Sequence, residues 1–334
     1  MSAAQPSQQA ATRLRLSMSL VPGPLTQPVL AGDVVPAGTD VAVTAGKSVD
    51  GNSRQMLNLA FDVAEMSLAT FLKAREQGTP LIGLPIFTGR RFLQPCVLVS
   101  TRAGIERPSD LAGKRVGLPQ FWMTSSLWHR GILEQQHGVA QDAVAWHTIT
   151  EERFAGLEMP PYVTLRRGAA EGSGPPDGFL QELLLAGELD ATMTPRPGDE
   201  LARRDSRVRQ LYRDVVQTQR EYYLSTGVFP IMHFVVMRAE LDAQHPWLAE
   251  SLCAAFAAAK ARARAAGAGP EPPIAGMAPA EVVAVFGEDS WPYGLERNRR
   301  TLETFVGFAT RQGLLHQPIP VDELFAPSTR HLFE

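Results

Sequence analysis

The sequence predicts an α/β protein with two lobes. Short apolar strands alternate with amphipathic helical segments along the chain, which is the pattern of this class. The 334 residues can bury a substantial core, and this length favours about two domains or one two-lobed unit. A turn over residues 108–119 leads into a new strand, and no internal repeat is visible. We therefore expect lobe 1 to comprise residues 13–100 and 229–334, and lobe 2 to comprise residues 101–228.

Lobe 1 begins after residues 1–12, a tail of small and polar residues that we expect to be flexible. Ser67 is a suitable N-cap for a helix that places Leu68 and Phe71 on one face. Strands are expected where apolar residues alternate or cluster, at 13–21, 40–44, 61–64, 81–87 and 96–100.

Lobe 2 continues the same alternation. Gly138 is expected to end the first helix of this lobe, because glycine readily adopts the left-handed conformation that follows a helix. Helices are predicted from about Thr124 to Gln136 and from about Asp177 to Ala186, and strands at 143–149 and 190–194.

The chain is expected to return to lobe 1 through the apolar run at residues 226–237. Two strands, near Cys96–Ser100 and Phe234–Met237, would then cross between the lobes. The closing helices are predicted to begin near Pro246, a favourable first-turn residue, and near Thr301, after which apolar residues repeat at helical spacing.

Composition excludes several classes of partner. The chain has 32 basic and 35 acidic residues and no basic stripe, so we expect no binding to nucleic acid. Its two cysteines, Cys96 and Cys253, are far apart in apolar contexts, which predicts reduced, buried thiols. His129 and His137 have no further ligands at suitable spacing, so we predict no metal site.

The N-terminal region lacks the features of a secreted or membrane protein. Arg15 interrupts any apolar stretch that could serve as a signal peptide. No apolar run approaches the ~18 residues that a membrane span requires. We therefore predict a cytoplasmic protein without membrane association.

His233 is the most informative single residue, because it lies inside an otherwise apolar, strand-like run. Its pKa and tautomer depend on whichever polar group it meets, which is how a proton donor is built. The alternative is a core histidine bonded to a main-chain carbonyl. Gly227 and Pro230 shape the entry to the strand, and residues 289–294 have the aromatic composition of a pocket wall.

Several segments carry a resemblance to known proteins. Residues 61–67, 110–117 and 188–191 resemble a type II periplasmic-binding-protein fold. Further segments are similar to the 4,5-dihydroxyphthalate decarboxylase family, at 120–124, 128–133, 227–233, 291–294 and 299–305. The resemblance runs from about Leu57 to Pro327. It implies a two-lobed binding-protein scaffold that has become a cytoplasmic enzyme removing CO2 from a hydroxylated aromatic acid.

The chain also departs from the pattern that this family leads us to expect. The loop Val21–Gln27 stands where an Asp-Arg-Thr stretch is expected, Leu93 and Gln94 replace an Arg-His pair, and Gln120 replaces an acidic residue. Several charged groups that would serve a dianionic catechol substrate are thus absent. The substrate is therefore less well indicated than the fold.

Candidate site residues follow from position and from the resemblance. Thr124, Ser125 and Ser126 begin a helix, where hydroxyls and free N–H groups can bind a carboxylate or simply cap the helix. Arg90 follows a strand and could pair with a carboxylate or lie on the surface. Glu65 could orient a histidine or only favour a helix start. The other substrate-binding candidates are Met66, Ser67, Arg196, Trp291 and Tyr293.

The implied mechanism needs no cofactor. A ring hydroxyl donates electron density, His233 protonates the ring carbon bearing the carboxylate with help from Glu65, and CO2 departs. Trp291 and Tyr293 would stack on the ring. The expected partner is a small aromatic carboxylate, and a homo-oligomer is left open. Two alternatives remain: a solute-binding or sensor protein without turnover, and an enzyme acting on another substrate.

Overall fold

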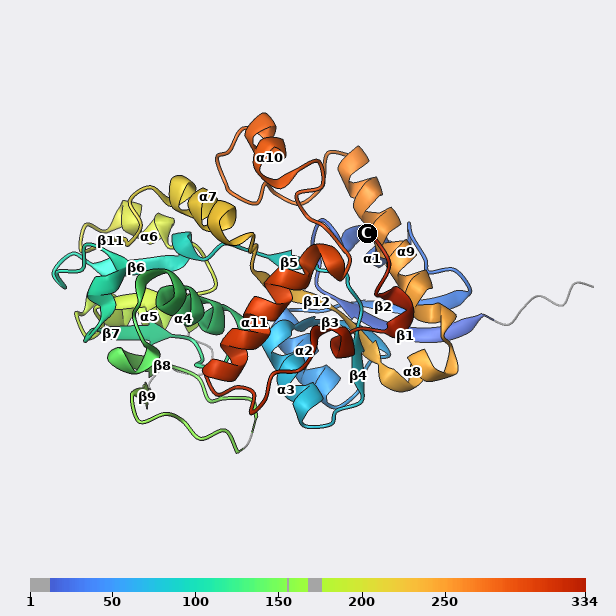
Figure 1. Ribbon diagram of the computed structural model, residues 1–334, viewed down its shortest axis with the longest axis horizontal. Helices are drawn as coiled ribbons and strands as arrows, with labels where there is room; N and C mark the ends of the chain where they lie inside the picture. The colour runs from blue at the N-terminus through green and yellow to red at the C-terminus, as the bar shows by residue number, and fades with distance from the viewer. Residues whose placement is uncertain (1–12, 155, 168–175) are drawn as a thin grey trace, which may run out of the picture.

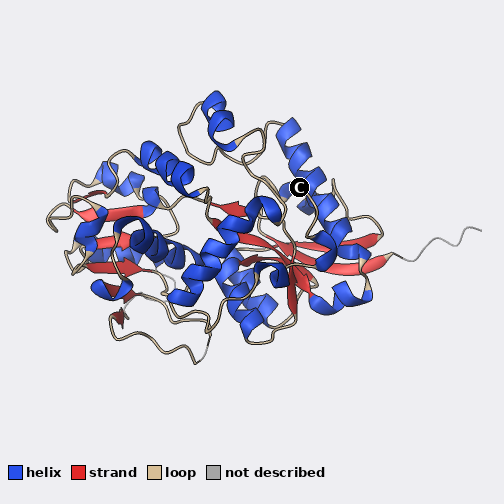
Figure 2. Cartoon of the chain, in the orientation of Figure 1, coloured by secondary structure: helices blue, strands red, loops and turns tan. Residues whose placement is uncertain are grey.

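The structure is a computed structural model that describes residues 13–154, 156–167 and 176–334. It contains two β-sheets, each flanked by helices, and the sheets lie side by side along the long axis of the molecule (Figures 1 and 2). The two-lobed α/β architecture is that of a type II periplasmic-binding-protein fold, as predicted. The tail predicted at residues 1–12 lies outside the described residues.

The first sheet has the strand order β2-β1-β3-β12-β4, with β5 also paired to β12. Strands β1, β2 and β3 run parallel, whereas β12 is antiparallel to β3, β4 and β5. Both faces of this sheet are covered, so its central strands are almost wholly apolar. The strands are β1 (Leu14–Leu20), β2 (Thr39–Ala45), β3 (Val63–Ser67), β4 (Leu81–Gly83), β5 (Gly89–Arg90) and β12 (Ile231–Arg238).

The second sheet has the order β11-β6-β10-β7-β8-β9. Its strands are β6 (Val97–Ser100), β7 (Arg115–Leu118), β8 (Ala145–Thr148), β9 (Val163–Leu165), β10 (Ala191–Met193) and β11 (Val208–Gln210). Residues 97–100 belong to the second sheet, so the prediction that they form part of lobe 1 is wrong. Strand β6 pairs with β10 and β11, so the chain leaves the first sheet before residue 97. A short apolar strand carries no information about which sheet it joins.

The helices cover the faces of the two sheets (Figure 2). Gly138 ends α4 in the left-handed conformation, with φ 66°, which confirms the predicted helix stop. Ser67 does hold the N-cap position of α3, but its hydroxyl makes no capping bond. The helices are α1 (Gln27–Leu30), α2 (Val49–Leu57), α3 (Leu68–Glu76), α4 (Thr124–His137), α5 (Pro176–Leu185), α6 (Asp199–Arg204), α7 (Val215–Thr226), α8 (Ala239–Gln244), α9 (Trp247–Ala265), α10 (Pro279–Phe286) and α11 (Arg299–Arg311).

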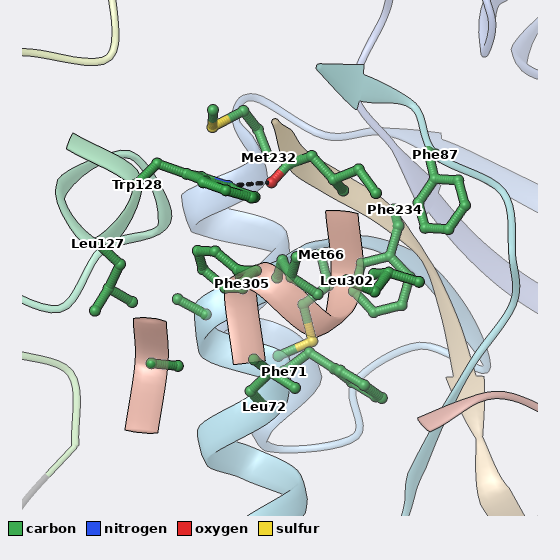
Figure 3. Packing of buried hydrophobic residues seen from close by; sticks show 14 of the residues in the cluster. Met66, Phe71, Leu72, Phe87, Leu127, Trp128, Met232, Phe234, Leu302 and Phe305 are labelled. Carbon is green, nitrogen blue, oxygen red and sulfur yellow. Dashed lines mark hydrogen bonds between the residues drawn. The ribbon is translucent and has the colours of Figure 1, made fainter. Parts of the chain in front are cut away.

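Helices α4 and α11 join the lobes through buried contacts (Figure 3). Trp128 of α4 packs on Phe305 of α11, with ring centroids 5.0 Å apart, and its indole N–H donates to the carbonyl of Ile231 at 3.0 Å. Gly131 lets the two helices approach, because a Cβ there would collide with the ring of Phe308. The N-terminus of α4 is therefore held in a fixed position between the lobes.

Candidate active site between the lobes

A cavity of about 200 Å³ lies between the lobes, and His233 lines it. Strand β12 pairs His233 with Ser67 of β3 on one side and with Gly89 of β5 on the other. Residues that pair directly across strands share a face of the sheet, so His233, Ser67 and Glu65 lie on one face. This register therefore brings three of the predicted site residues close to one another.

Gly89 is required by the position of the imidazole. A Cβ at this residue would lie 2.6 Å from Nδ1 of His233 and 2.9 Å from its Cγ. These distances are shorter than any ordinary contact, so only glycine allows β5 to approach the ring this closely.

Glu65 lies next to His233 and is almost completely buried. Its Oε1 is 3.8 Å from Nδ1 of His233 and accepts a hydrogen bond from the Thr88 hydroxyl at 2.7 Å. The main-chain N–H of Val21 donates to Oε2 at 3.1 Å. Burial nevertheless raises the pKa of Glu65, because desolvation outweighs these two bonds.

The pKa of His233 moves in the opposite direction. Burial, assisted by the positive charge of Arg91, lowers the pKa of His233 to about 4, although 37% of the side chain is exposed where it lines the cavity. Desolvation thus favours the uncharged form of both partners. Two titratable groups with displaced pKa values beside a cavity are typical of a catalytic site.

The N-terminus of α4 faces the same cavity. Thr124 and Ser125 both line it, and each is at most 5% exposed. The Thr124 hydroxyl lies 2.9 Å from the Ser67 hydroxyl and accepts from the N–H of Ala69 at 3.0 Å. The hydroxyl of Ser125 has no hydrogen-bond partner among the residues that the structure describes. An anion at this position would be stabilised by the helix dipole, by the first-turn N–H groups and by this hydroxyl.

Two arginines that line the cavity were not predicted. Arg91 is exposed, lines the cavity and donates to the carbonyl of Pro195 from the second lobe. Arg153, in the loop after β8, pairs with Asp50 and donates to the Thr70 hydroxyl at 2.6 Å. Loops at the carboxyl ends of parallel strands often build binding sites, so the position of Arg153 after β8 was an available signal.

Arg90 also lines the cavity, but its donors are directed elsewhere. The guanidinium donates to the carbonyls of Phe229 and Pro292, at 3.3 and 3.0 Å, and to the side chain of Asn298. It lies over the rings of Phe87 and Phe229. Burial lowers the pKa of Arg90 to about 9. The observed bonds hold the main chain together, rather than leaving a free fork for a carboxylate.

Four other candidates do not line this cavity. Met66 points to the opposite face of β3 from Glu65 and is fully buried in the core (Figure 3). Arg196 is exposed beside Pro195. Tyr293 is buried, with its ring 4.4 Å from the ammonium of Lys260. Trp291 donates to the carbonyl of Phe87 and lines a second, neighbouring cavity.

Three further expectations can be compared with the described part of the chain. Cys96 and Cys253 are both buried, as predicted. Residues 13–154, 156–167 and 176–334 contain no group of three or more side chains placed to hold a metal ion. In the same ranges, no helix combines the length and apolarity needed to cross a bilayer.

Sequence comparisons identify relatives. The chain is 28% identical to a 4,5-dihydroxyphthalate decarboxylase of Comamonas testosteroni, over 97% of this chain and 99% of the relative. The chain is a relative of this decarboxylase. A second protein of the same name, from Pseudomonas putida, is also 28% identical, over 63% of this chain and 82% of its own length. No protein-family model matches the chain.

Solved structures agree with this fold. The periplasmic aliphatic sulphonate binding protein SsuA of Escherichia coli superposes with a TM-score of 0.57 at 11% identity, covering 95% of this chain and 99% of SsuA. The desulfurization enzyme DSZB superposes with a TM-score of 0.50 at 17% identity, covering 94% of this chain and 96% of the enzyme. The fold of this chain is thus shared by a binding protein and by an enzyme.

Proposed function

We propose that this chain is a carboxy-lyase that removes CO2 from a hydroxylated aromatic carboxylic acid bound between the lobes, without a cofactor. The observation that carries the proposal is the pair formed by half-buried His233 and buried Glu65 beside a cavity that suits an anion. The similarity to 4,5-dihydroxyphthalate decarboxylases over almost the whole chain supports the same reaction class.

The substrate carboxylate would bind at the N-terminus of α4. The first-turn N–H groups and the hydroxyl of Ser125 supply hydrogen bonds, and Arg91 supplies charge. Arg153 is already paired with Asp50, so it contributes less free charge to the cavity. This arrangement holds the ring next to His233.

His233 would supply the proton. An anionic substrate opposes the desolvation of the imidazolium, so its arrival raises the pKa of His233 and allows protonation from Glu65 or from solvent. The substrate hydroxyl then donates electron density, and the imidazolium protonates the ring carbon that bears the carboxylate. The bond to the carboxylate carbon breaks, its electron pair restores the aromatic ring, and CO2 leaves. His233 must be reprotonated before the next turnover.

The test is incubation of the purified protein with a panel of hydroxybenzoates, hydroxyphthalates and 4,5-dihydroxyphthalate, with CO2 release and loss of substrate recorded together. The proposal expects CO2 from at least one compound and none from the same compound with His233→Asn. Release of CO2 that is unaffected by this substitution would contradict the role of His233. If compounds bind but none of them releases CO2, the proposal that the chain is a carboxy-lyase is contradicted.

A binding or sensor protein is the second candidate. One observation favours it: the unpartnered hydroxyl of Ser125 at the N-terminus of α4 would hold an anion equally well without turnover. This candidate expects melting-temperature shifts with aromatic carboxylates and unchanged ligand after prolonged incubation.

A further inference from the structure

A second cavity of about 340 Å³ adjoins the first, and both are lined by Arg90 and Arg91. Thr88, whose hydroxyl donates to Glu65, also lines the second cavity. The two cavities are therefore neighbours that share two arginines, and Thr88 connects the lining of the second cavity to the candidate catalytic pair.

The surface of the second cavity is mainly hydrocarbon. Leu25, Phe92, Phe229 and Trp291 line it, and the proline-rich segment 270–273 closes one side. The polar groups of this surface are largely occupied. The indole N–H of Trp291 donates to Phe87, and the side-chain amide of Gln219 donates to Val215. An apolar group that enters here would not deprive the donors of Trp291 and Gln219 of their hydrogen-bond partners.

The charges of this cavity do not suit a second carboxylate. Its charged lining residues are Arg90, Arg91 and Glu271. Arg90 is buried and donates to carbonyls, and Arg91 is shared with the first cavity. Glu271 is exposed at the surface of the cavity and would repel an anion.

The first cavity is small for a substituted ring. Its volume of about 200 Å³ lies below the roughly 300–1,000 Å³ of sites for larger ligands. A hydroxylated ring with its carboxylate fits this space, whereas a further substituent requires the neighbouring one.

We propose that the second cavity binds an uncharged, apolar substituent of the substrate while the carboxylate lies beside His233 in the first. This inference rests on the proposed function, and it names the substrate class as a hydroxybenzoic acid that carries an alkyl or aryl group. A second carboxylate at the same ring position is disfavoured, because Arg90 already donates to carbonyls, Arg91 is shared with the first carboxylate, and Glu271 repels an anion.

Binding is measured first, by calorimetry on the full-length protein. The probes are 2-hydroxybenzoate, its butyl and phenyl derivatives at ring positions 4 and 5, and the matching carboxy derivatives. We expect at least one butyl or phenyl compound to bind about tenfold or more tightly than 2-hydroxybenzoate, and the carboxy compounds to show no such gain. Equal or weaker binding of all the apolar derivatives overturns the inference, as does an absence of binding by every probe.

The second measurement uses a variant in which a large side chain fills the second cavity. Ala275 is exposed and lines the second cavity, so Ala275→Trp occupies it without disturbing the core. The matched control is Ala280→Trp, at an exposed alanine on α10 that lines neither cavity. The preference for the apolar derivatives should be lost in Ala275→Trp and kept in Ala280→Trp. If Ala275→Trp does not fold, Ala275→Asp must remove the same preference. A preference that survives in the folded variant overturns the inference.

CO2 release separates this inference from the proposed function. Tighter binding of the apolar derivatives without CO2 supports the second cavity and contradicts the carboxy-lyase. CO2 from unsubstituted or dicarboxylic compounds, with no gain from an apolar group, supports the carboxy-lyase and overturns the inference.

Discussion

At the scale of single residues, burial shifts the pKa values of His233 and Glu65 in opposite directions. Burial lowers the pKa of the imidazole and raises the pKa of the carboxyl, so each partner is favoured in its uncharged form until an anion arrives. The importance of His233 could be predicted from the sequence, because a polar side chain in an apolar run needs a tertiary partner. The identity of that partner as Glu65 depends on strand register, and sequence spacing does not determine it.

The first prediction concerns His233→Asn. The amide keeps a hydrogen-bonding group of similar size, so fold and ligand affinity should be largely retained. Turnover should fall by roughly 10²- to 10⁴-fold, because the proton donor is lost. Melting temperature and CO2 release are measured on one sample. A folded variant with the parental turnover would refute the catalytic role.

The second prediction concerns proton uptake. The pKa of His233 is about 4 in the free protein and should be higher in the complex. At a pH between these two values, His233 is neutral when the site is empty and protonated when an anion is bound. Binding should therefore take up protons, and affinity should rise as pH falls from neutral towards about 4.

Calorimetry at one pH in buffers of different ionisation enthalpy measures this uptake. His233→Asn should reduce it. The same uptake in the variant and the parent would assign the proton to another group.

The third prediction concerns Arg90. Because its guanidinium donates to two buried carbonyls and to Asn298, Arg90→Met should lower the free energy of unfolding by about 2–4 kcal/mol. Denaturant unfolding measures the loss. A variant of parental stability that has lost ligand affinity would instead restore Arg90 as a carboxylate-binding residue.

At the scale of elements, the site is formed where strand pairing brings distant segments together. The alternation of strands and helices and the start and stop of α4 could be predicted, because periodicity, caps and glycine are local signals. The pairing of β5 with β12 could not be predicted from the sequence, because β5 is only two residues long. The burial of Tyr293 and the second cavity beside Trp291 are likewise tertiary features that composition cannot place.

The fourth prediction tests the approach of β5 to β12. Gly89→Ala places a methyl group 2.6 Å from Nδ1 of His233, so the ring must move away from its position near Glu65. Turnover should fall at least tenfold, with a smaller effect on stability than a core cavity would cause. Gly178→Ala in α5 is the control, because an added Cβ there meets nothing within 4 Å. Equal turnover in the two variants would contradict the importance of this approach.

At the scale of the whole molecule, polar contacts cross the mouth of the cleft while apolar contacts join the lobes behind it. Arg153 of the second lobe reaches Asp50 and Thr70 of the first. Arg91 reaches Pro195 in the opposite direction. These contacts are polar and partly exposed, and they are therefore weaker than the contact between α4 and α11.

The fifth prediction concerns Arg153→Met, which leaves Asp50 beside an anion site with Arg54 as its remaining ion-pair partner. Affinity for 2-hydroxybenzoate should fall by about 1–3 kcal/mol, and adding Asp50→Asn should recover part of the loss. The control is Arg167→Met, because Arg167 is highly exposed and pairs with exposed Glu151. Calorimetry on these three variants and on the parent completes the test. Unchanged affinity in Arg153→Met would remove this arginine from the site.

The packing of α4 on α11 also bears on the order in which the chain assembles during synthesis. Helix α4 presents its first turn to the ligand, yet the rings that support it, Phe305 and Phe308, belong to a segment made about 180 residues later. A nascent chain that stops at residue 298 already has His233, Glu65 and Ser125 but lacks the helix that seats α4. The first turn of α4 is therefore fixed between the lobes only when nearly the whole chain has been made.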